Sequence, residues 1–182
     1  NFTTMSNERK MIYLCLAHMS DKGLEQKYIK EAFDTNWVVP LGPNVNAFED
    51  DLKQFVGKDQ QGQEKEVVAL SAGTAAVHLA LIACGVKAGD EVCVQSFTFC
   101  ASSHPITYLG AKPVFIDSER DTWNMDPELL EKAIIERKEV TGQYPKAIIP
   151  VALYGMPYDC EKIMAIADKY GIPVIEDAAE GM

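Results

Sequence analysis

The sequence predicts an α/β protein in which a mostly parallel β-sheet lies between two layers of helices. From residue 66 onward, short apolar segments alternate with longer segments that have helical spacing. Strands separated by helices are joined by right-handed crossovers, which makes neighbouring strands parallel. The strand segments are apolar throughout, as expected where helices cover both faces of a sheet. These two observations favour a three-layer α/β/α architecture.

The first part of the chain predicts helices that precede the sheet. Residues 1–10 are polar and predict a tail or the remnant of a tag, and residues 11–57 predict a helical segment. Apolar residues recur at helical spacing from Leu24 to Phe33. Asn44 is the expected cap of a second helix, which ends at Gly57. The sequence NWVVPLGP between the two helices contains two prolines and a glycine, which exclude a helix interior.

Residues 66–182 predict the front part of one sheet-containing domain. The predicted strands are residues 67–70, 91–95, 113–116, 147–151 and 173–176. The predicted helices between them are residues 75–84, 101–109, 127–138 and 160–170. Asp126 followed by Pro127 marks the start of the third of these helices. Because the chain stops just after the last predicted strand, we expect it to be the front part of a longer protein.

Composition restricts the class of partner. Of the 182 residues, 47% are apolar and 24% are charged, which is typical of a globular protein. The formal charge of −10 disfavours binding to nucleic acid or to an anionic membrane surface. The five cysteines include no CxxC pair and the three histidines are isolated, so we expect neither disulfides nor a metal site. This pattern predicts a reducing, cytoplasmic environment.

Unusual residues follow three of the predicted strands. After residues 67–70, small residues lead directly into a helix, so the N–H groups of Gly73, Thr74 and Ala75 are suited to a phosphate. After residues 91–95, the sequence SFTF supplies Phe97 and Phe99, one of which can stack on a flat heterocycle. The last predicted strand runs into Asp177. Because the carboxyl ends of parallel strands meet at one edge of a sheet, these residues are expected to converge.

Each feature alone has an ordinary explanation. The small-residue turn is also an ordinary βα turn, the phenylalanines are also core residues, and Asp177 is also a helix cap. Together, a phosphate clamp, a stacking ring and a buried carboxylate describe a site for pyridoxal 5′-phosphate, in which the carboxylate keeps the pyridine nitrogen protonated. A dinucleotide site is not favoured, because no GxGxxG follows any predicted strand.

Several motifs, in this order and spacing, resemble one known family. They are SAGTAAVHLAL, GDEVCVQSFTFCAS, GAKPVFID, LYG and VIEDAAE, preceded by LAHMS and FDTNWVVPLGPNVNAFE. The chain from about Met11 resembles the pyridoxal-phosphate-dependent sugar aminotransferases of the DegT/DnrJ/EryC1/StrS family. It looks most like the bacterial branch that aminates C4 of UDP-linked 4-keto-6-deoxy sugars for surface glycans.

The resemblance implies an aspartate-aminotransferase-like large domain of fold type I, incomplete in this chain. It implies that Gly73, Thr74 and Ala75 hold the cofactor phosphate. It further implies that Phe99 stacks on the pyridine ring, that Asp177 pairs with the ring nitrogen, and that Glu180 lies near the ring hydroxyl. Of these, Asp177 is the expected catalytic residue.

The resemblance also implies a homodimer with active sites at the subunit interface, glutamate as the amino donor and a nucleotide-linked keto-sugar as the acceptor. The family's Schiff-base lysine belongs to a later serine–aromatic segment that this chain does not contain. We therefore expect the 182-residue chain alone to be inactive. Two alternatives stay open: a sugar 3-dehydratase of the same family, with histidine in place of the lysine, and a non-catalytic fragment that keeps only the phosphate site.

Overall fold

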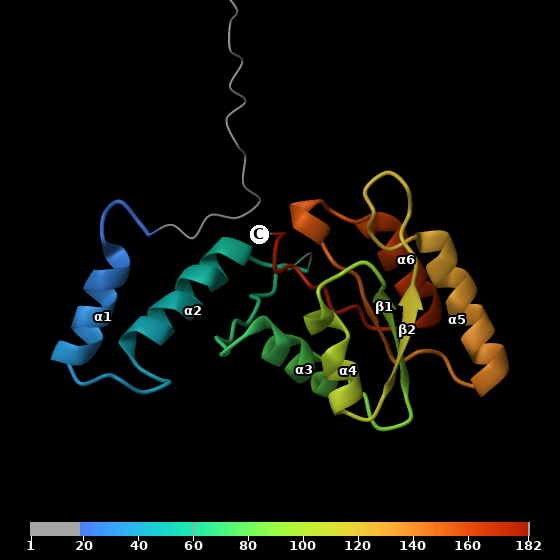
Figure 1. The fold of residues 1–182 in the computed structure, drawn as a ribbon, viewed down its shortest axis with the longest axis horizontal. Helices are drawn as coiled ribbons and strands as arrows, with labels where there is room; N and C mark the ends of the chain where they lie inside the picture. Colours follow the sequence, from blue (N-terminus) through green and yellow to red (C-terminus); the bar gives the residue numbers. More distant parts are fainter. Residues whose placement is uncertain (1–18, 60, 182) are drawn as a thin grey trace, which may run out of the picture. The chain divides into compact units, whose positions relative to one another are not determined.

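The computed structural model describes residues 19–59 and 61–181 (Figure 1). It divides into two compact units, residues up to Ala69 and residues from Leu70. The predicted tail, residues 1–10, and the first part of the predicted helical segment, residues 11–18, lie outside the described residues. Among the described residues, no helix is long and apolar enough to cross a membrane.

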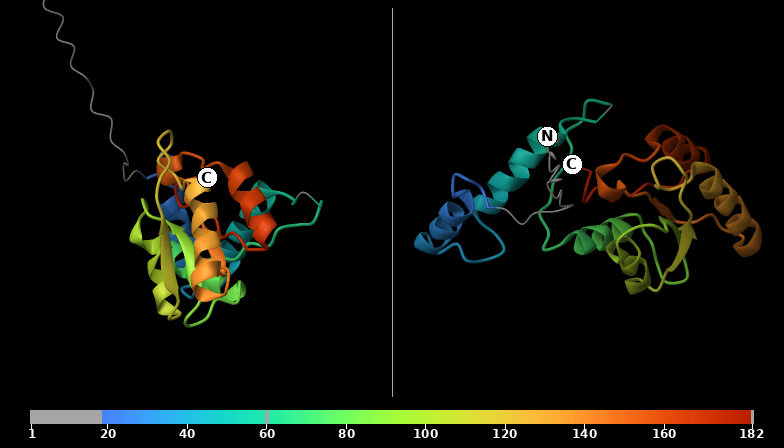
Figure 2. Two further views of the ribbon diagram at one scale, coloured as in Figure 1. Left: turned by 90° about the vertical axis from the view of Figure 1, so that its right-hand side faces the viewer. Right: turned by 45° about the horizontal axis from the view of Figure 1, so that its top comes forward.

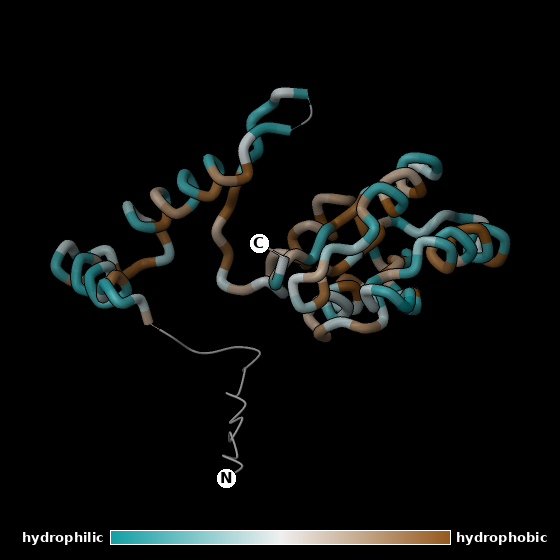
Figure 3. The backbone as a smooth tube through the Cα atoms, turned by 90° about the horizontal axis from the view of Figure 1, so that it is seen from above, coloured by the Kyte–Doolittle hydropathy of each residue, from teal (hydrophilic) through white to brown (hydrophobic). Residues whose placement is uncertain are grey.

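The first unit contains two amphipathic helices, α1 (Leu24–Asp34) and α2 (Pro43–Val56). Along α2, hydrophobic and hydrophilic residues alternate, as the changing colour of the tube shows (Figure 3). The cap of α2 is Gly42 and not the expected Asn44. The reason is Pro43, which occupies the first helical position. A proline is favourable there, because the N–H that it lacks would make no hydrogen bond within the helix. Gly57 ends α2 as expected.

The second unit contains a parallel sheet built from β1 (Glu91–Gln95), β2 (Lys112–Ile116) and β3 (Ala147–Ile149). The strand order is β2-β1-β3, with β1 in the centre. Both of its neighbours pair with β1 in the parallel direction, as the βα alternation in the sequence predicts. Strand β3 is two residues shorter than expected, because pairing beyond Ile149 continues only as an isolated bridge at Val151.

The expected strand at residues 173–176 is present as parallel pairing along the free edge of β3. Val174 bridges Ile148, and Asp177 bridges Val151. The Ile175 N–H donates to the Ile148 carbonyl at 2.9 Å. The pairing consists of isolated bridges and not of a continuous ladder, and it carries Asp177 to the carboxyl edge of the sheet.

The expected strand at residues 67–70 is wrong. Val68 is 62% exposed, and the segment forms no β-ladder with any described residue. The physical reason is that strand propensity alone does not make a strand of a segment that no neighbouring strand pairs with. Strand β1 is already paired on both sides, by β2 and β3.

The helices of the second unit are α3, α4, α5 and α6. Their bounds are Gly73–Ala83, His104–Tyr108, Pro127–Thr141 and Cys160–Tyr170. Two short 3-10 turns, Cys100–Ser102 and Leu153–Gly155, follow β1 and β3. The predicted single helix at residues 101–109 is in fact the first of these turns followed by α4. Pro105 explains the break, because proline fits only the first turn of a helix.

Helices lie on both faces of the sheet (Figures 1 and 2). A hydrophobic cluster packs between the sheet and the helices on each face. Side chains alternate between faces along each strand. Val92 and Val94 of β1 therefore pack with α3 and α4, whereas Cys93 packs with α5 and α6. Within β3, Ile149 joins the first cluster and Ile148 joins the second. Residues 92–95 of the central strand β1 are buried on both faces, as expected for a strand covered by helices on both sides, whereas the edge strand β2 leaves Phe115 57% exposed.

Candidate active site

A pocket of about 360 Å³ opens at the carboxyl ends of the strands. Its wall comes from the segments that follow β1, β3 and residues 173–177. The lining residues are Phe97, Thr98, Phe99, Val151, Leu153, Tyr154, Asp177, Ala179 and Glu180. This volume lies in the range of small-molecule sites, which measure about 300–1,000 Å³.

Asp177 is held in this pocket by its backbone and by its side chain. Its N–H donates to the Pro150 carbonyl at 3.0 Å, and its carbonyl accepts from the Ala152 N–H at 3.1 Å. Its carboxylate accepts from the Ser102 hydroxyl at 2.6 Å and from the Ala179 N–H at 3.3 Å. The side chain is partly buried, so it keeps access to the pocket while its orientation is fixed.

Phe97 and Phe99 lie in different surroundings. Phe97 packs edge-to-face against Trp123, with ring centroids 6.0 Å apart. Both rings line the pocket, but Phe99 is 78% exposed whereas Phe97 is 45% exposed. An exposed ring at the wall of a pocket is available to stack on a flat ligand. The structure therefore favours Phe99 over Phe97 as the stacking ring.

Glu180 lies at the same pocket and is bound to the turn after β3. Its carboxylate accepts the N–H of Tyr154 at 2.6 Å. Tyr154 has a φ of +53°, a left-handed conformation that is uncommon for a tyrosine. The two segments approach closely, since a Cβ added to Gly155 would lie 2.9 Å from the Glu180 carbonyl oxygen. A Cβ added to Gly181 would lie 2.7 Å from the Ala152 Cβ.

Gly73, Thr74 and Ala75 form the first turn of α3. Ala72 precedes them in an extended conformation, and no side chain caps the helix. The first N–H bonded back along the chain is that of Ala76, which donates to the Ala72 carbonyl at 3.1 Å. Within residues 19–59 and 61–181, the N–H groups of Gly73, Thr74 and Ala75 donate no hydrogen bond, and the space around Gly73 is open. Such a helix start suits an anion.

The structure brings Phe99, Asp177 and Glu180 together in one pocket. It does not include Gly73, Thr74 or Ala75 in the lining of that pocket. The residue types nevertheless fit pyridoxal phosphate: an open helix start suits its phosphate, an exposed ring suits its pyridine face, and a fixed carboxylate suits its ring nitrogen.

Sequence reasoning missed the buried polar residues behind the pocket. Gln95 and Asn124 are fully buried and hydrogen-bonded to each other at 3.3 Å. The Gln95 Oε1 accepts the N–H groups of Met125 and Val151, at 2.9 and 3.3 Å. Asn124 in turn accepts the Leu153 N–H at 3.1 Å. The available signal was a glutamine at the end of an otherwise apolar strand, since a buried amide needs partners.

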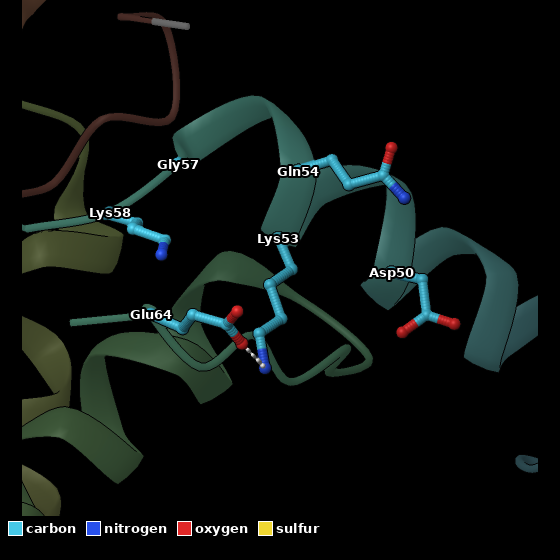
Figure 4. Close-up of a pocket in the computed structure, with 6 residues that line it drawn as sticks. All are labelled: Asp50, Lys53, Gln54, Gly57, Lys58 and Glu64. Atoms are coloured by element: carbon cyan, nitrogen blue, oxygen red, sulfur yellow. Dashed lines mark ion pairs between the residues drawn. The ribbon is translucent and has the colours of Figure 1, made fainter. Parts of the chain in front are cut away.

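A second hollow, in the first unit, lies at the end of α2 (Figure 4). Lys53 pairs there with Glu64 at 3.4 Å and with Glu66 at 3.2 Å. The hydrogen bond to Glu66 raises the pKa of the Lys53 ammonium. A lysine held in its charged form by carboxylates is a poor nucleophile or base. Among the described residues, no group of three His, Cys, Asp or Glu side chains is arranged to hold a metal ion.

The fold and the pocket together define a class of protein, the α/β enzymes that bind a cofactor at the carboxyl edge of a parallel sheet. Residues 20–182 match the sequence profile of the DegT/DnrJ/EryC1/StrS aminotransferase family, and the chain belongs to this family. The resemblance noted in the motifs is thereby confirmed.

Curated relatives agree with this assignment. The chain is 53% identical over 173 residues to EpsN of Bacillus subtilis, to which a pyridoxal phosphate-dependent aminotransferase activity is attributed. That alignment covers 95% of this chain and 42% of EpsN. The chain is also 47% identical over 140 residues to UDP-2-acetamido-2-deoxy-3-oxo-D-glucuronate aminotransferase of Pseudomonas aeruginosa. That alignment covers 77% of this chain and 35% of the relative. The chain thus spans less than half the length of these relatives.

Solved structures agree as well. The structure matches a DegT DnrJ EryC1 StrS aminotransferase from Brucella abortus with a TM-score of 0.73 and 36% identity, over 89% of this chain and 44% of that chain. It matches NtdA from Bacillus subtilis, solved with bound cofactor PMP, with a TM-score of 0.78 and 31% identity, over 90% of this chain and 35% of that chain. These matches confirm the α/β fold type and indicate pyridoxal phosphate as the cofactor.

Proposed function

We propose that the complete protein containing this chain is a pyridoxal-phosphate-dependent aminotransferase that transfers an amino group from glutamate to a nucleotide-linked keto-sugar in surface-glycan biosynthesis. The observation that carries the proposal is the pocket that is lined by both a hydrogen-bonded carboxylate, Asp177, and an exposed ring, Phe99. Family membership and the named activities of the relatives support it.

The roles of the chain's own residues follow from their chemistry. Pyridoxal phosphate, when bound, supplies the electron sink for the reaction. Asp177 would hold the proton on its ring nitrogen, and Phe99 would cover one face of the ring. The first turn of α3, from Gly73 to Ala75, would bind the phosphate through backbone N–H groups. Glu180 would orient the ring hydroxyl.

The substrate and the assembly belong to the same proposal. The expected C4 keto-sugar is one candidate, whereas the name of the Pseudomonas aeruginosa relative specifies a 3-oxo sugar. We propose a cytoplasmic homodimer whose active sites lie at the subunit interface. Sedimentation of the full-length protein measures its mass in solution, and a monomer would contradict the dimer.

Asp177→Asn in the full-length protein tests the function. This change keeps the shape of the side chain and removes the charge that retains the ring proton. We expect turnover of glutamate with UDP- or GDP-linked keto-sugars to be lost, with an unchanged circular dichroism spectrum. Asp168→Asn, on the exposed surface of α6, is the matched control. Equal activity of the two variants would contradict the role of Asp177.

Product analysis separates the alternatives. An aminotransferase incorporates nitrogen from ¹⁵N-glutamate into the sugar, whereas a 3-dehydratase releases a deoxygenated sugar without it. The 182-residue chain assayed alone is expected to be inactive, and measurable transamination by it would contradict the assignment of the Schiff-base lysine to a later segment.

A further inference from the structure

Two hydroxyl groups lie in series behind the carboxylate of Asp177. Ser102 Oγ donates to Asp177 Oδ2 at 2.6 Å. Thr98 Oγ1 lies 2.8 Å from Ser102 Oγ. Ser102 is fully buried and is not part of the pocket wall, whereas Thr98 lines the pocket between Phe97 and Phe99. Ser102 can therefore act on a bound molecule only through the two pocket residues that it contacts, Asp177 and Thr98.

The direction of the two hydrogen bonds follows from the number of protons that each side chain can donate. An ionised carboxylate accepts hydrogen bonds and cannot donate one, so the Ser102 proton points to Asp177. A serine hydroxyl has a single proton, so Ser102 Oγ can only accept from Thr98. The chain therefore runs from the Thr98 hydroxyl to the Ser102 hydroxyl and on to the Asp177 carboxylate. Bonds in such a series strengthen one another.

This series joins parts of the chain that are far apart in sequence. Ser102 and Asp177 are separated by 75 positions. Ser102 lies in the turn that follows β1, and Asp177 pairs with Val151, which follows β3. The neighbours of Thr98 include Phe99, the proposed stacking ring. One hydrogen-bonded series therefore sets both the angle of the carboxylate and the placement of the aromatic segment beside it.

We propose that Ser102 is a positioning residue that holds the Asp177 carboxylate toward the ring nitrogen of the cofactor, and that Thr98 holds Ser102 in this role. The inference rests on the proposed function of Asp177. Without the Ser102 hydroxyl, the hydrogen bond left to the carboxylate among the described residues is the 3.3 Å contact with the Ala179 N–H.

The test is Ser102→Ala in the full-length protein, read by two measurements besides activity. The first is the dissociation constant of pyridoxal phosphate. We expect it to rise about tenfold, which is the lower end of the effect of losing a hydrogen bond to a charged group. The second is the pH titration of the absorbance of the bound cofactor. We expect its midpoint to shift in the same direction as in Asp177→Asn, but by a smaller amount. A purely structural role would leave that titration unchanged.

Three further variants isolate the hydroxyl series. Ser103→Ala removes the neighbouring hydroxyl, which donates to the Cys100 carbonyl, and is expected to match the wild type. Thr98→Val keeps the size of the side chain and removes its donor, so it is expected to shift the titration in the same direction as Ser102→Ala. Thr98→Ser restores the donor and is expected to return to wild-type values.

The outcomes separate this inference from the proposed function. If Asp177→Asn abolishes turnover while Ser102→Ala and Thr98→Val both behave like Ser103→Ala, the inference is wrong and the function stands. If Asp177→Asn changes neither turnover nor absorbance, the function assigned to Asp177 is wrong and the inference falls with it. If Ser102→Ala does not fold, the comparison of Thr98→Val with Thr98→Ser decides.

Discussion

At the scale of single residues, the buried amide of Gln95 connects the sheet to the site. Its Oε1 accepts two backbone N–H groups, and its Nε2 donates to the Phe97 carbonyl at 2.9 Å. Gln95 thereby fixes the backbone from which Thr98 and Phe99 project. The polar groups of the site are thus supported by polar groups in the interior.

Gln95→Leu is expected to destabilise the protein by about 2 kcal/mol or more. The change leaves the buried N–H groups of Met125 and Val151 without their acceptor, and each unsatisfied group costs about 1–3 kcal/mol. Urea denaturation measures the loss. Gln143→Leu, at an exposed position, is the control, and equal stability of the two variants would contradict the prediction.

Leu130 and Leu129 offer a matched pair on α5. Leu130 is 0% exposed within the second cluster, whereas Leu129 is 38% exposed. Leu130→Ala is expected to lower the free energy of unfolding by about 2–5 kcal/mol, because a cavity remains where the side chain was. Leu129→Ala is expected to cost much less. Thermal or urea denaturation checks the order, and the reverse order would show that α5 packs through another face.

Because of Cys93, the free energy of unfolding is expected to depend on pH in the alkaline range. Burial raises the pKa of its thiol to about 12, and Glu91 adds to the effect. Because the folded pKa lies above the unfolded value, the stabilisation is complete below the unfolded pKa and declines as the pH rises toward the folded one. Above about pH 8.5, the free energy of unfolding of the wild type is expected to fall by about 1.4 kcal/mol per pH unit relative to that of Cys93→Ala. Denaturation of both proteins from pH 7 to 11 measures this, and a constant difference would disprove it.

At the scale of elements, the residues that cap a helix predict where it begins and ends, because a helix depends on neighbouring residues in the sequence. Helix α6 begins and ends as its sequence predicts, because Asp159 accepts the Lys162 N–H at one end and Gly171 adopts a left-handed φ at the other. The segment at residues 67–70 failed as a prediction, because a strand depends on a distant partner. For the same reason the sequence pointed to Asp177 and Phe99 but not to Ser102, whose role needs a contact across 75 positions.

Asp126 tests a locally predicted element. Its side chain accepts the N–H groups of Glu128 at 2.8 Å and Leu129 at 3.2 Å at the start of α5. Asp126→Ala is expected to lower stability by about 1 kcal/mol, the usual loss for an N-cap. Glu139→Ala, at an exposed position of the same helix, is expected to change stability little. Denaturation midpoints compare the two, and an unaffected Asp126→Ala would show that the cap is replaced by solvent.

At the scale of the whole molecule, burial is distributed unevenly between the two units. Strand β1 is paired on both sides and contributes to both hydrophobic clusters. Helices α1 and α2 contain no buried residue. In the 182-residue chain, amide exchange is therefore expected to be slowest in β1 and fastest in α1, because exchange follows local opening. Hydrogen-exchange mass spectrometry resolves the two segments, and equal protection would show that α1 is covered.

The close approach at Gly155 and Gly181 limits which side chains the segments around the pocket can accept. Added Cβ atoms at these positions would lie 2.9 Å from the Glu180 carbonyl oxygen and 2.7 Å from the Ala152 Cβ. Any side chain at either position would force the two loops apart by a fraction of an ångström or more, and Tyr154 and Glu180 would move with them. A library designed to change substrate preference should therefore keep glycine at both positions. At position 154 it should favour residues that tolerate a left-handed φ, such as asparagine, over β-branched ones.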